Sequence, residues 1–212
     1  MKAILMSVRP KWCELIASGK KTVEIRKTVP KLETPFKVYI YCTQGDALAL
    51  PCLNNPHYTI YRMNNGTVNG RQMTAKEREQ SDHSFANGKV IGEFVCDSFE
   101  YYTSNCTALE SVLLPSPNDL AEMCLTLEEF NAYGARGKLL YGWRISDLVI
   151  YHEPKELNEF WRADKCPYAS KDGCTYKYHC FRVGQTKRCG DTLTRPPQSW
   201  CYVEELAGGG AE

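Results

Sequence analysis

Hydrophobic and polar residues alternate along several short segments of the chain. In the segment FKVYIYC, Phe36 and Val38 fall on one face and Lys37 falls on the other. This period of two is typical of β-strands, whose successive side chains point to opposite faces of a sheet, and it predicts half-buried strands. The segments that we expect to be strands are residues 2–7, 21–27, 36–42, 89–97, 139–152 and 198–204.

Two segments show helical signals instead. Residues 10–18 place Pro10 in a first turn and repeat apolar residues at helical spacing, and Gly19 follows as a residue that often ends helices. A second helix is expected after Thr126, whose hydroxyl can cap the first turn while Glu129 caps it in return. Both helices are short.

Short strands interrupted by short helices predict a mainly β fold with short helices (α+β), arranged as a β-barrel or a strongly curved sheet. Residues 43–88 are polar, with a helical turn or two in TAKEREQSD, and are expected to form a long functional insertion. Pro154 is expected to open another short helix. The domains that we expect are a barrel over 1–155 that includes the 43–88 loop, a cysteine-rich insert over 156–197, a closing strand over 198–206 and a flexible tail over 207–212.

The composition is that of an ordinary globular protein. Of the 212 residues, 43% are hydrophobic and 24% are charged, which excludes disordered and fibrous classes. No apolar run approaches the ~20 residues that span a bilayer, and the N-terminal run is too short for a signal peptide, so we expect a cytoplasmic protein without a membrane partner. The net charge of +1 gives no general attraction to nucleic acid, which would need a local basic patch.

The strand expected at residues 21–27 carries opposite charges on one face. Glu24 and Arg26 share this face, about 6–7 Å apart along the strand. Val23 and Ile25 share the other face, which we expect to lie against the core. The carboxylate and the guanidinium are thus close enough to share a ligand or to join in an ion-pair network.

A hydroxyl, an aromatic ring and several cations lie just before or at the start of this strand. They are Ser7, Arg9, Trp12, Lys20 and Lys21. Cations that surround an aromatic ring suit a phosphate group or a stacked base. The alternative is a solvated strand face, on which an exposed ion pair contributes less than ~1 kcal/mol.

The most specific signature lies in residues 7–27, SVRPKWCELIASGKKTVEIRK, which combine an SxxP start, a short helix and the pattern GxKxxExR. Here the chain resembles the ASCH domain, a relative of the PUA fold, most strongly over residues 3–27 and more loosely around Glu93 and in YGWRI at 141–145. The resemblance implies a PUA-like β-barrel with a cleft beside the GxKxxExR strand, where RNA or a modified nucleotide binds. The residues expected at this cleft are Ser7, Arg9, Trp12, Lys20, Lys21, Glu24 and Arg26.

Some ASCH-like proteins are hydrolases, so the resemblance implies an enzyme on the same cleft as the alternative. The reaction would be deacylation of N4-acetylcytidine or cleavage of RNA, with Lys21 and Glu24 in catalytic roles. Glu24 stands where the deacylases carry a threonine, and a carboxylate cannot replace a hydroxyl nucleophile without a change of mechanism. Their catalytic glutamate matches Glu93, Glu128 or Glu129. We therefore favour binding; a protein-interaction role of the 43–88 loop is a third hypothesis.

The chain contains 11 cysteines, which without an export signal favour reduced thiols, some on a metal, over a disulfide framework. Four thiolates suit the tetrahedral preference of zinc, and the C-terminal region has few aliphatic residues with which to build a core. The ligands that we expect for a structural zinc ion are Cys166, Cys174, Cys180 and Cys189, with His179 or Cys201 as substitutes. The alternative is a set of ordinary cysteines in a basic and aromatic loop.

The zinc hypothesis predicts that protein purified without chelator carries about one zinc ion per chain, because four thiolates form one tetrahedral site. Elemental analysis of the purified protein measures this ratio directly. A zinc-to-protein ratio near zero would contradict the hypothesis.

Overall fold

The computed structural model of the chain describes residues 1–44, 87–103, 114–134, 139–163 and 192–206 in full. It also gives the backbone of short strands at 47–51, 58–64, 67–68, 71–72, 169–170 and 173–174. The fully described ranges contain one six-stranded sheet and three short α-helices. None of the described helices is long and apolar enough to cross a membrane.

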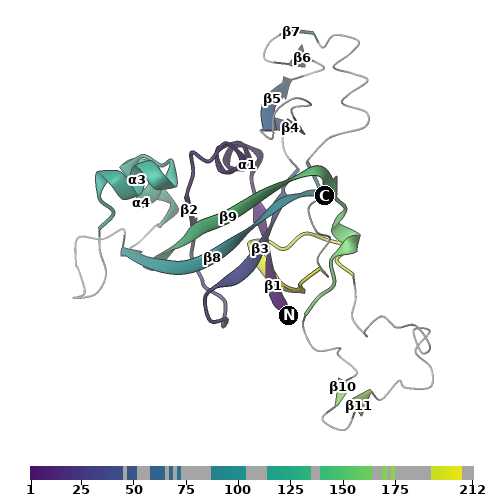
Figure 1. The fold of residues 1–212 in the computed structure, drawn as a ribbon. Helices are drawn as coiled ribbons and strands as arrows, with labels where there is room; N and C mark the ends of the chain where they lie inside the picture. The colour runs from purple at the N-terminus through teal and green to yellow at the C-terminus, as the bar shows by residue number, and fades with distance from the viewer. Residues whose placement is uncertain are drawn as a thin grey trace.

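The six-stranded sheet forms the centre of the described structure (Figure 1). Its strands are β1 (Lys2–Val8), β2 (Val23–Arg26), β3 (Phe36–Cys42), β8 (Val90–Thr103), β9 (Leu139–Lys155) and β12 (Trp200–Glu204). Their order is β12-β1-β3-β8-β9-β2, in which β1 and β3 run parallel and the other neighbours are antiparallel. Each strand overlaps a segment in which alternation predicts one, so the mainly β fold with short helices is confirmed.

Helix α1 (Pro10–Ala17) connects β1 to β2, as its sequence signals predict. Proline occupies the first turn, and the chain leaves the helix through Gly19, whose φ of +70° is a left-handed conformation that glycine adopts at little cost. Cys13 and Ile16 are buried in one core cluster with Val38 of β3. Helix α1 therefore covers one face of the sheet.

Helices α3 (Pro117–Met123) and α4 (Leu127–Tyr133) lie near the β2 edge of the sheet (Figure 1). Helix α4 begins with the predicted capping box, in which the Thr126 hydroxyl accepts from the Glu129 amide and the Glu129 carboxylate accepts from the Thr126 amide. Helix α3 was not predicted, although it begins with an equivalent box formed by Ser116 and Asp119.

The apolar residues of β2 pack against these two helices. Val23 and Ile25 share a buried cluster with Met123 of α3 and Phe130 of α4. Helices α3 and α4 therefore cover the face of β2 that is opposite to the charged residues, as the alternation of the strand requires.

Both faces of the central strands are buried, which corrects the prediction of half-buried strands. Phe36 and Val38 of β3 belong to the cluster under α1, whereas Tyr39 and Tyr41 belong to a second cluster on the other face, with Phe160. The alternation itself was predicted correctly. The burial of the second face was not predicted, because the residues that cover it come from distant parts of the chain.

The sheet does not close into the expected barrel in the described residues, since β12 and β2 are its two unpaired edges. Side chains bridge these edges instead. The indole N–H of Trp200 donates to the Thr28 hydroxyl (3.0 Å), and the backbone N–H of Lys31 donates to the Tyr202 hydroxyl (2.7 Å). The described residues therefore form an open, curved sheet, and hydrogen bonds of Trp200 and Tyr202 connect β12 to the segment that follows β2.

The C-terminal part of β9 corrects another prediction. Pro154 does not open a helix; it lies inside β9, and only a 3-10 turn follows at Leu157–Glu159. The β8–β9 register is irregular between Val90 and Gly92, where a proline without an N–H is more easily accommodated.

The expected loop over 43–88 contains backbone strands. They are β4 (Ala47–Pro51), β5 (Tyr58–Asn64), β6 (Thr67–Val68) and β7 (Arg71–Gln72), which form a separate antiparallel sheet. The TAKEREQSD segment, for which a helical turn was predicted, lies outside the described residues.

Gly92 allows β8 and β9 to approach each other closely. A Cβ at this position would lie 2.4 Å from the Val149 carbonyl oxygen and 3.1 Å from the Ile150 Cα, both of which are backbone atoms. We expect Gly92→Ala to lower the free energy of unfolding by roughly 2 kcal/mol, because one strand must shift. Urea unfolding measures the change.

The control for this variant is Val149→Ala, which truncates an exposed side chain on the strand opposite Gly92. This control should change stability by less than ~0.5 kcal/mol. A Gly92→Ala protein as stable as the control would contradict the close approach of the two strands.

Candidate functional site

Strand β2 determines the direction in which its charged side chains point. Its register with β9 pairs Glu24 with Trp143 and Arg26 with Tyr141. Directly opposed residues of antiparallel strands share a face, and both aromatic partners belong to or pack on the core cluster under α1. Glu24 and Arg26 therefore share a face, as predicted, but this face points inward.

Lys21, Glu24 and Arg26 form a buried group of charges, the charged triad. Glu24 Oε1 lies 3.0 Å from Arg26 Nη2, and Glu24 Oε2 lies 3.4 Å from Lys21 Nζ. The exposed fractions of Lys21, Glu24 and Arg26 are only 3%, 6% and 8%. Two positive charges and one negative charge leave the triad with a net charge of +1.

Each cation of the triad also donates to a backbone carbonyl from a distant segment. Lys21 Nζ donates to the carbonyl of Met123 at the end of α3 (2.5 Å). Arg26 Nη2 donates to the carbonyl of Ser7 in β1 (2.7 Å). The triad therefore ties the edge strand β2 to α3 on one side and to β1 on the other.

The backbone around Lys21 is held by two helices. The Lys21 amide donates to the Leu15 carbonyl of α1 (2.9 Å), and the Thr22 amide donates to the Glu122 carbonyl of α3 (3.0 Å). These bonds orient the Lys21 side chain before any ligand arrives.

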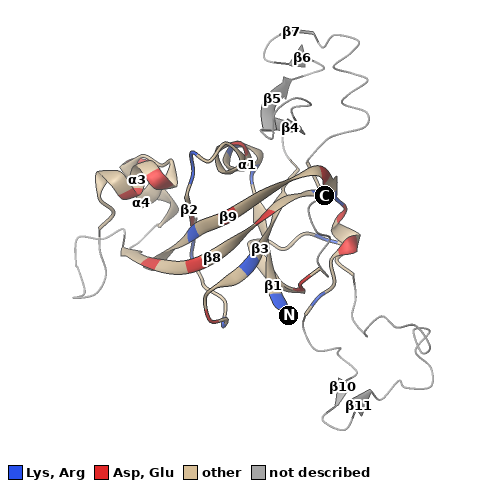
Figure 2. Cartoon of the chain, viewed as in Figure 1, with Lys and Arg blue, Asp and Glu red and all other residues tan. Residues whose placement is uncertain are grey.

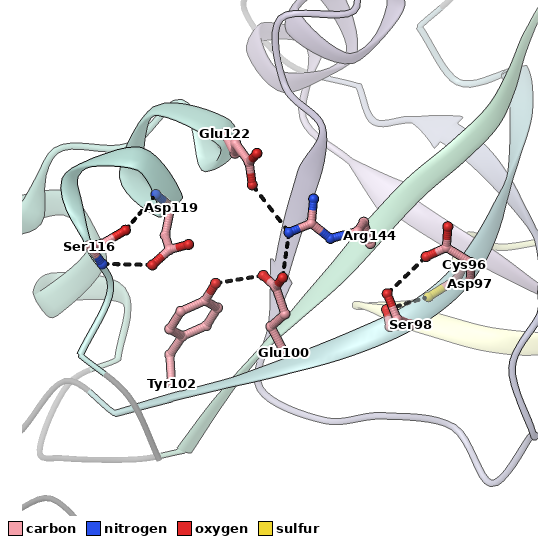
Figure 3. A network of polar contacts seen from close by, with 9 residues as sticks. All are labelled: Cys96, Asp97, Ser98, Glu100, Tyr102, Ser116, Asp119, Glu122 and Arg144. Atoms are coloured by element: carbon pink, nitrogen blue, oxygen red, sulfur yellow. Dashed lines mark hydrogen bonds and ion pairs between the residues drawn. The ribbon is translucent and has the colours of Figure 1, made fainter. Parts of the chain in front are cut away.

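A second polar network fixes α3 against the sheet (Figure 3). The Arg144 guanidinium of β9 pairs with Glu100 of β8 and with Glu122 of α3, the latter at 3.3 Å. The Tyr102 hydroxyl donates to Glu100 Oε2 (2.6 Å); burial and this hydrogen bond raise the pKa of Tyr102, so the hydroxyl stays protonated. The network thereby positions the Met123 carbonyl that accepts from Lys21.

Two buried N–H groups beside Glu24 have no acceptor in the part of the chain that the structure describes. Within the described residues, neither Arg26 Nε nor Trp143 Nε1 has a hydrogen-bond partner. An unpaired buried donor costs about 1–3 kcal/mol, so such a group requires an explanation. A ligand with acceptor atoms would supply the missing partners.

The side chain of Trp12 lies beside two lysines. The Lys21 and Lys11 ammonium groups lie 5.1 Å and 4.3 Å from the centre of the Trp12 ring, within the range of cation–π contacts. The predicted association of cations with an aromatic ring is therefore present.

Tyr133, at the end of α4, is a member of the site that the sequence did not reveal. It is 38% exposed, and the Lys27 ammonium lies 4.8 Å from its ring centre. Burial raises the pKa of Tyr133, Glu24 raises it further, and Arg26 lowers it, so the hydroxyl lies within electrostatic reach of the triad. No local pattern could identify this residue, because only the docking of α4 brings it there.

Cys13 of α1 lies beside the triad and is fully buried. Burial raises the pKa of the Cys13 thiol well above its usual range; the neighbouring Cys42 and Glu24 raise it further, and Arg26 lowers it. The thiol is therefore a neutral, weakly polar neighbour of the charged triad.

The other predicted site residues lie around the triad in different ways. The Ser7 hydroxyl donates to the Pro197 carbonyl (2.6 Å). Ser7 therefore contacts Arg26 through its backbone carbonyl, which accepts from Arg26 Nη2. Arg9 is the exposed N-cap residue of α1, and Lys20 is exposed just before Lys21. Contact of these residues with a ligand stays a prediction.

The predicted zinc ligands lie beyond the side chains that the structure describes. Cys174 falls in the short backbone strand β11 (Gly173–Cys174), while Cys166, Cys180 and Cys189 fall outside the described residues. Among the side chains that are described, no three His, Cys, Asp or Glu residues gather as a metal site. The zinc site stays a prediction.

The triad predicts a large effect of removing its only negative charge. Glu24→Gln keeps the shape of the side chain but leaves two buried cations without a counter-charge, so we expect the free energy of unfolding to fall by about 3 kcal/mol. Urea unfolding followed by tryptophan fluorescence measures the loss. Glu129→Gln is the matched control, because Glu129 pairs with Lys11 at the surface and glutamine retains the capping box. Equal stability of the two variants would contradict the burial of the triad.

A protein-family model matches the part of the chain that contains the motif in β2. No curated protein sequence matches the chain significantly. Two crystal structures of the ASCH protein from Zymomonas mobilis are similar to it: one of a tyrosine-to-phenylalanine mutant (14% identity, 97% of this chain and 92% of that chain, TM-score 0.49) and one without a stated mutation (15%, 96% and 88%, TM-score 0.45). The family model described as the ASCH domain matches residues 6–177, which include the whole of the triad and most of the sheet. The chain therefore belongs to the ASCH domain family.

Proposed function

We propose that the chain binds single-stranded RNA, or a modified nucleotide, at the charged triad. The observation that carries this proposal is the combination of a buried carboxylate with two buried N–H donors, Arg26 Nε and Trp143 Nε1, for which the described residues provide no acceptor. A protein interior seldom leaves such donors unused. Membership of the ASCH domain family supports the proposal, because RNA is the expected ligand of this family.

A nucleobase edge complements the groups that the triad offers. Bases present N–H donors next to carbonyl or ring-nitrogen acceptors, and RNA-binding proteins hydrogen-bond to these edges when the base is unpaired. Glu24 is an acceptor, whereas Arg26 Nε and the ammonium of Lys21 are donors. The central carboxylate disfavours a phosphate group at the same position. The triad therefore suits a base more than a phosphate.

Phosphates would instead meet the exposed cations around the triad. Figure 2 shows basic positions in blue on the segment between α1 and β2. Arg9, Lys11, Lys20 and Lys27 are all exposed and flank the triad in sequence or in space. Phosphate contacts position a nucleic acid without reading its bases, which leaves recognition to the triad.

The pairing of Glu24 argues for binding over hydrolysis. A general base must accept a proton in the reaction, but each oxygen of Glu24 already pairs with a cation. Protonation of Glu24 would break two buried ion pairs. Lys21 is likewise engaged twice, in the ion pair with Glu24 and in the hydrogen bond that it donates to the Met123 carbonyl.

Arg26→Lys tests the proposal without removing the positive charge. Lysine lacks the Nε–H and the planar fork of arginine, so we expect affinity for RNA to fall about tenfold or more, as for the loss of a charged hydrogen bond. Fluorescence anisotropy of a labelled ten-nucleotide single-stranded RNA, at one fixed salt concentration, measures the dissociation constant.

Arg162→Lys is the matched control, since Arg162 is exposed and lies outside the triad. Thermal melting of both variants separates a loss of binding from a loss of folding. Equal RNA affinity of folded Arg26→Lys, the control and the unmodified protein would refute the triad as the binding site. Hydrolysis of RNA or N4-acetylcytidine by the intact protein would favour the enzyme instead.

A further inference from the structure

Two tyrosines continue the face of the charged triad across the sheet. Tyr141 of β9 is paired with Arg26 on one side and with Tyr101 of β8 on the other. Because opposed residues share a face, the three side chains form one row across neighbouring strands. The rings of Tyr101 and Tyr141 lie 5.5 Å apart at an angle of 68°. We call this pair of rings the tyrosine platform.

The platform is exposed, unlike the row beside it. The neighbouring row consists of Glu24, Trp143 and Phe99, in which Trp143 is fully buried and Phe99 is partly buried. In the outer row Tyr141 is partly buried and Tyr101 is 47% exposed. Exposure therefore increases from the triad toward β8, so a ligand at the triad can continue over the platform.

We propose that the tyrosine platform stacks a second base, next to the base held at the triad, so that the ligand is a single strand of RNA of at least two nucleotides. This inference rests on the proposed function. Neighbouring strands lie ~4.8 Å apart, which places Tyr101 roughly 10 Å from Arg26 along the row. The bases of neighbouring nucleotides in a single strand can be splayed apart when they are unstacked, so one strand can place a base at each position.

The chemistry of the platform favours a base over a protein partner. A stable protein interface buries about 800 Å² on each side, whereas an aromatic side chain offers at most ~250 Å². Leu139 of β9 and Tyr133 near the triad are further exposed apolar residues in the described part of the chain, at 36% and 38% exposure. Lys27 follows Arg26, is exposed and has its ammonium 4.8 Å from the ring centre of Tyr133, so a cation that can meet the phosphates lies next to the triad. Rings beside cations are typical of single-strand binding.

The test compares variants on the same labelled ten-nucleotide RNA by fluorescence anisotropy at several salt concentrations. Tyr101→Leu keeps an apolar side chain but removes the aromatic face, so we expect affinity to fall about fivefold or more. The slope of affinity against salt should not change, because no phosphate contact is lost. Tyr101→Phe keeps the ring and should bind as the unmodified protein does. Val149→Ala, an exposed apolar position near the other end of β9, is the control.

Each other outcome overturns the inference. If Tyr101→Leu binds RNA as the unmodified protein does while Arg26→Lys binds weakly, the platform does not stack a base, and the proposed function at the triad still holds. A weaker salt dependence of Tyr101→Leu would show that the lost contact is with phosphate and not with a base. An equal loss in Tyr101→Phe would assign the effect to the hydroxyl. An unmodified protein that binds no RNA would refute both the proposed function and the platform.

Discussion

The burial of three charges in one place is the constraint on which the rest of the structure depends. Removing a charged group from water costs several kcal/mol, and only close partners offset the cost. Glu24 provides one negative charge for two cations, Lys21 and Arg26. The carbonyl oxygens of Met123 and Ser7 must therefore accept further hydrogen bonds from these cations. Because these carbonyls belong to α3 and β1, the triad can be satisfied only when both elements are in place.

This requirement explains how a short edge strand stays on an open sheet. β2 has only four residues and, among the described strands, one neighbour, β9. Its apolar face packs on α3 and α4, its polar face is bonded to β1, and the Arg144 network holds α3 to β8 and β9. A closed barrel would hold β2 by backbone hydrogen bonds to a second strand; here a side-chain hydrogen bond from Arg26 to β1 holds it instead.

The sequence predicted the parts of this arrangement that depend on local pattern. Alternation placed the strands and put Glu24 and Arg26 on one face, and the capping box of Thr126 placed α4, because these signals act within a few residues. Tertiary packing decided the rest. The inward direction of the charged face depends on contacts of Lys21 and Arg26 with residues 102 and 19 positions away. Helix α3 was not predicted, because its capping box contains Asp119 in place of the usual glutamate or glutamine.

Stability alone does not explain why charged residues occupy the position of the triad. Well-packed apolar residues often stabilise a core as much as a buried ion pair does, or more, and this core already has aromatic residues on the same face, among them Trp143 and Tyr141. A purely structural role would favour complete pairing, yet Arg26 Nε and Trp143 Nε1 lack acceptors among the described residues. Local rules that a fold breaks without structural gain are expected at functional sites. The proposed ligand would bring acceptors to these donors, and it would extend along the exposed rings that continue from Arg26.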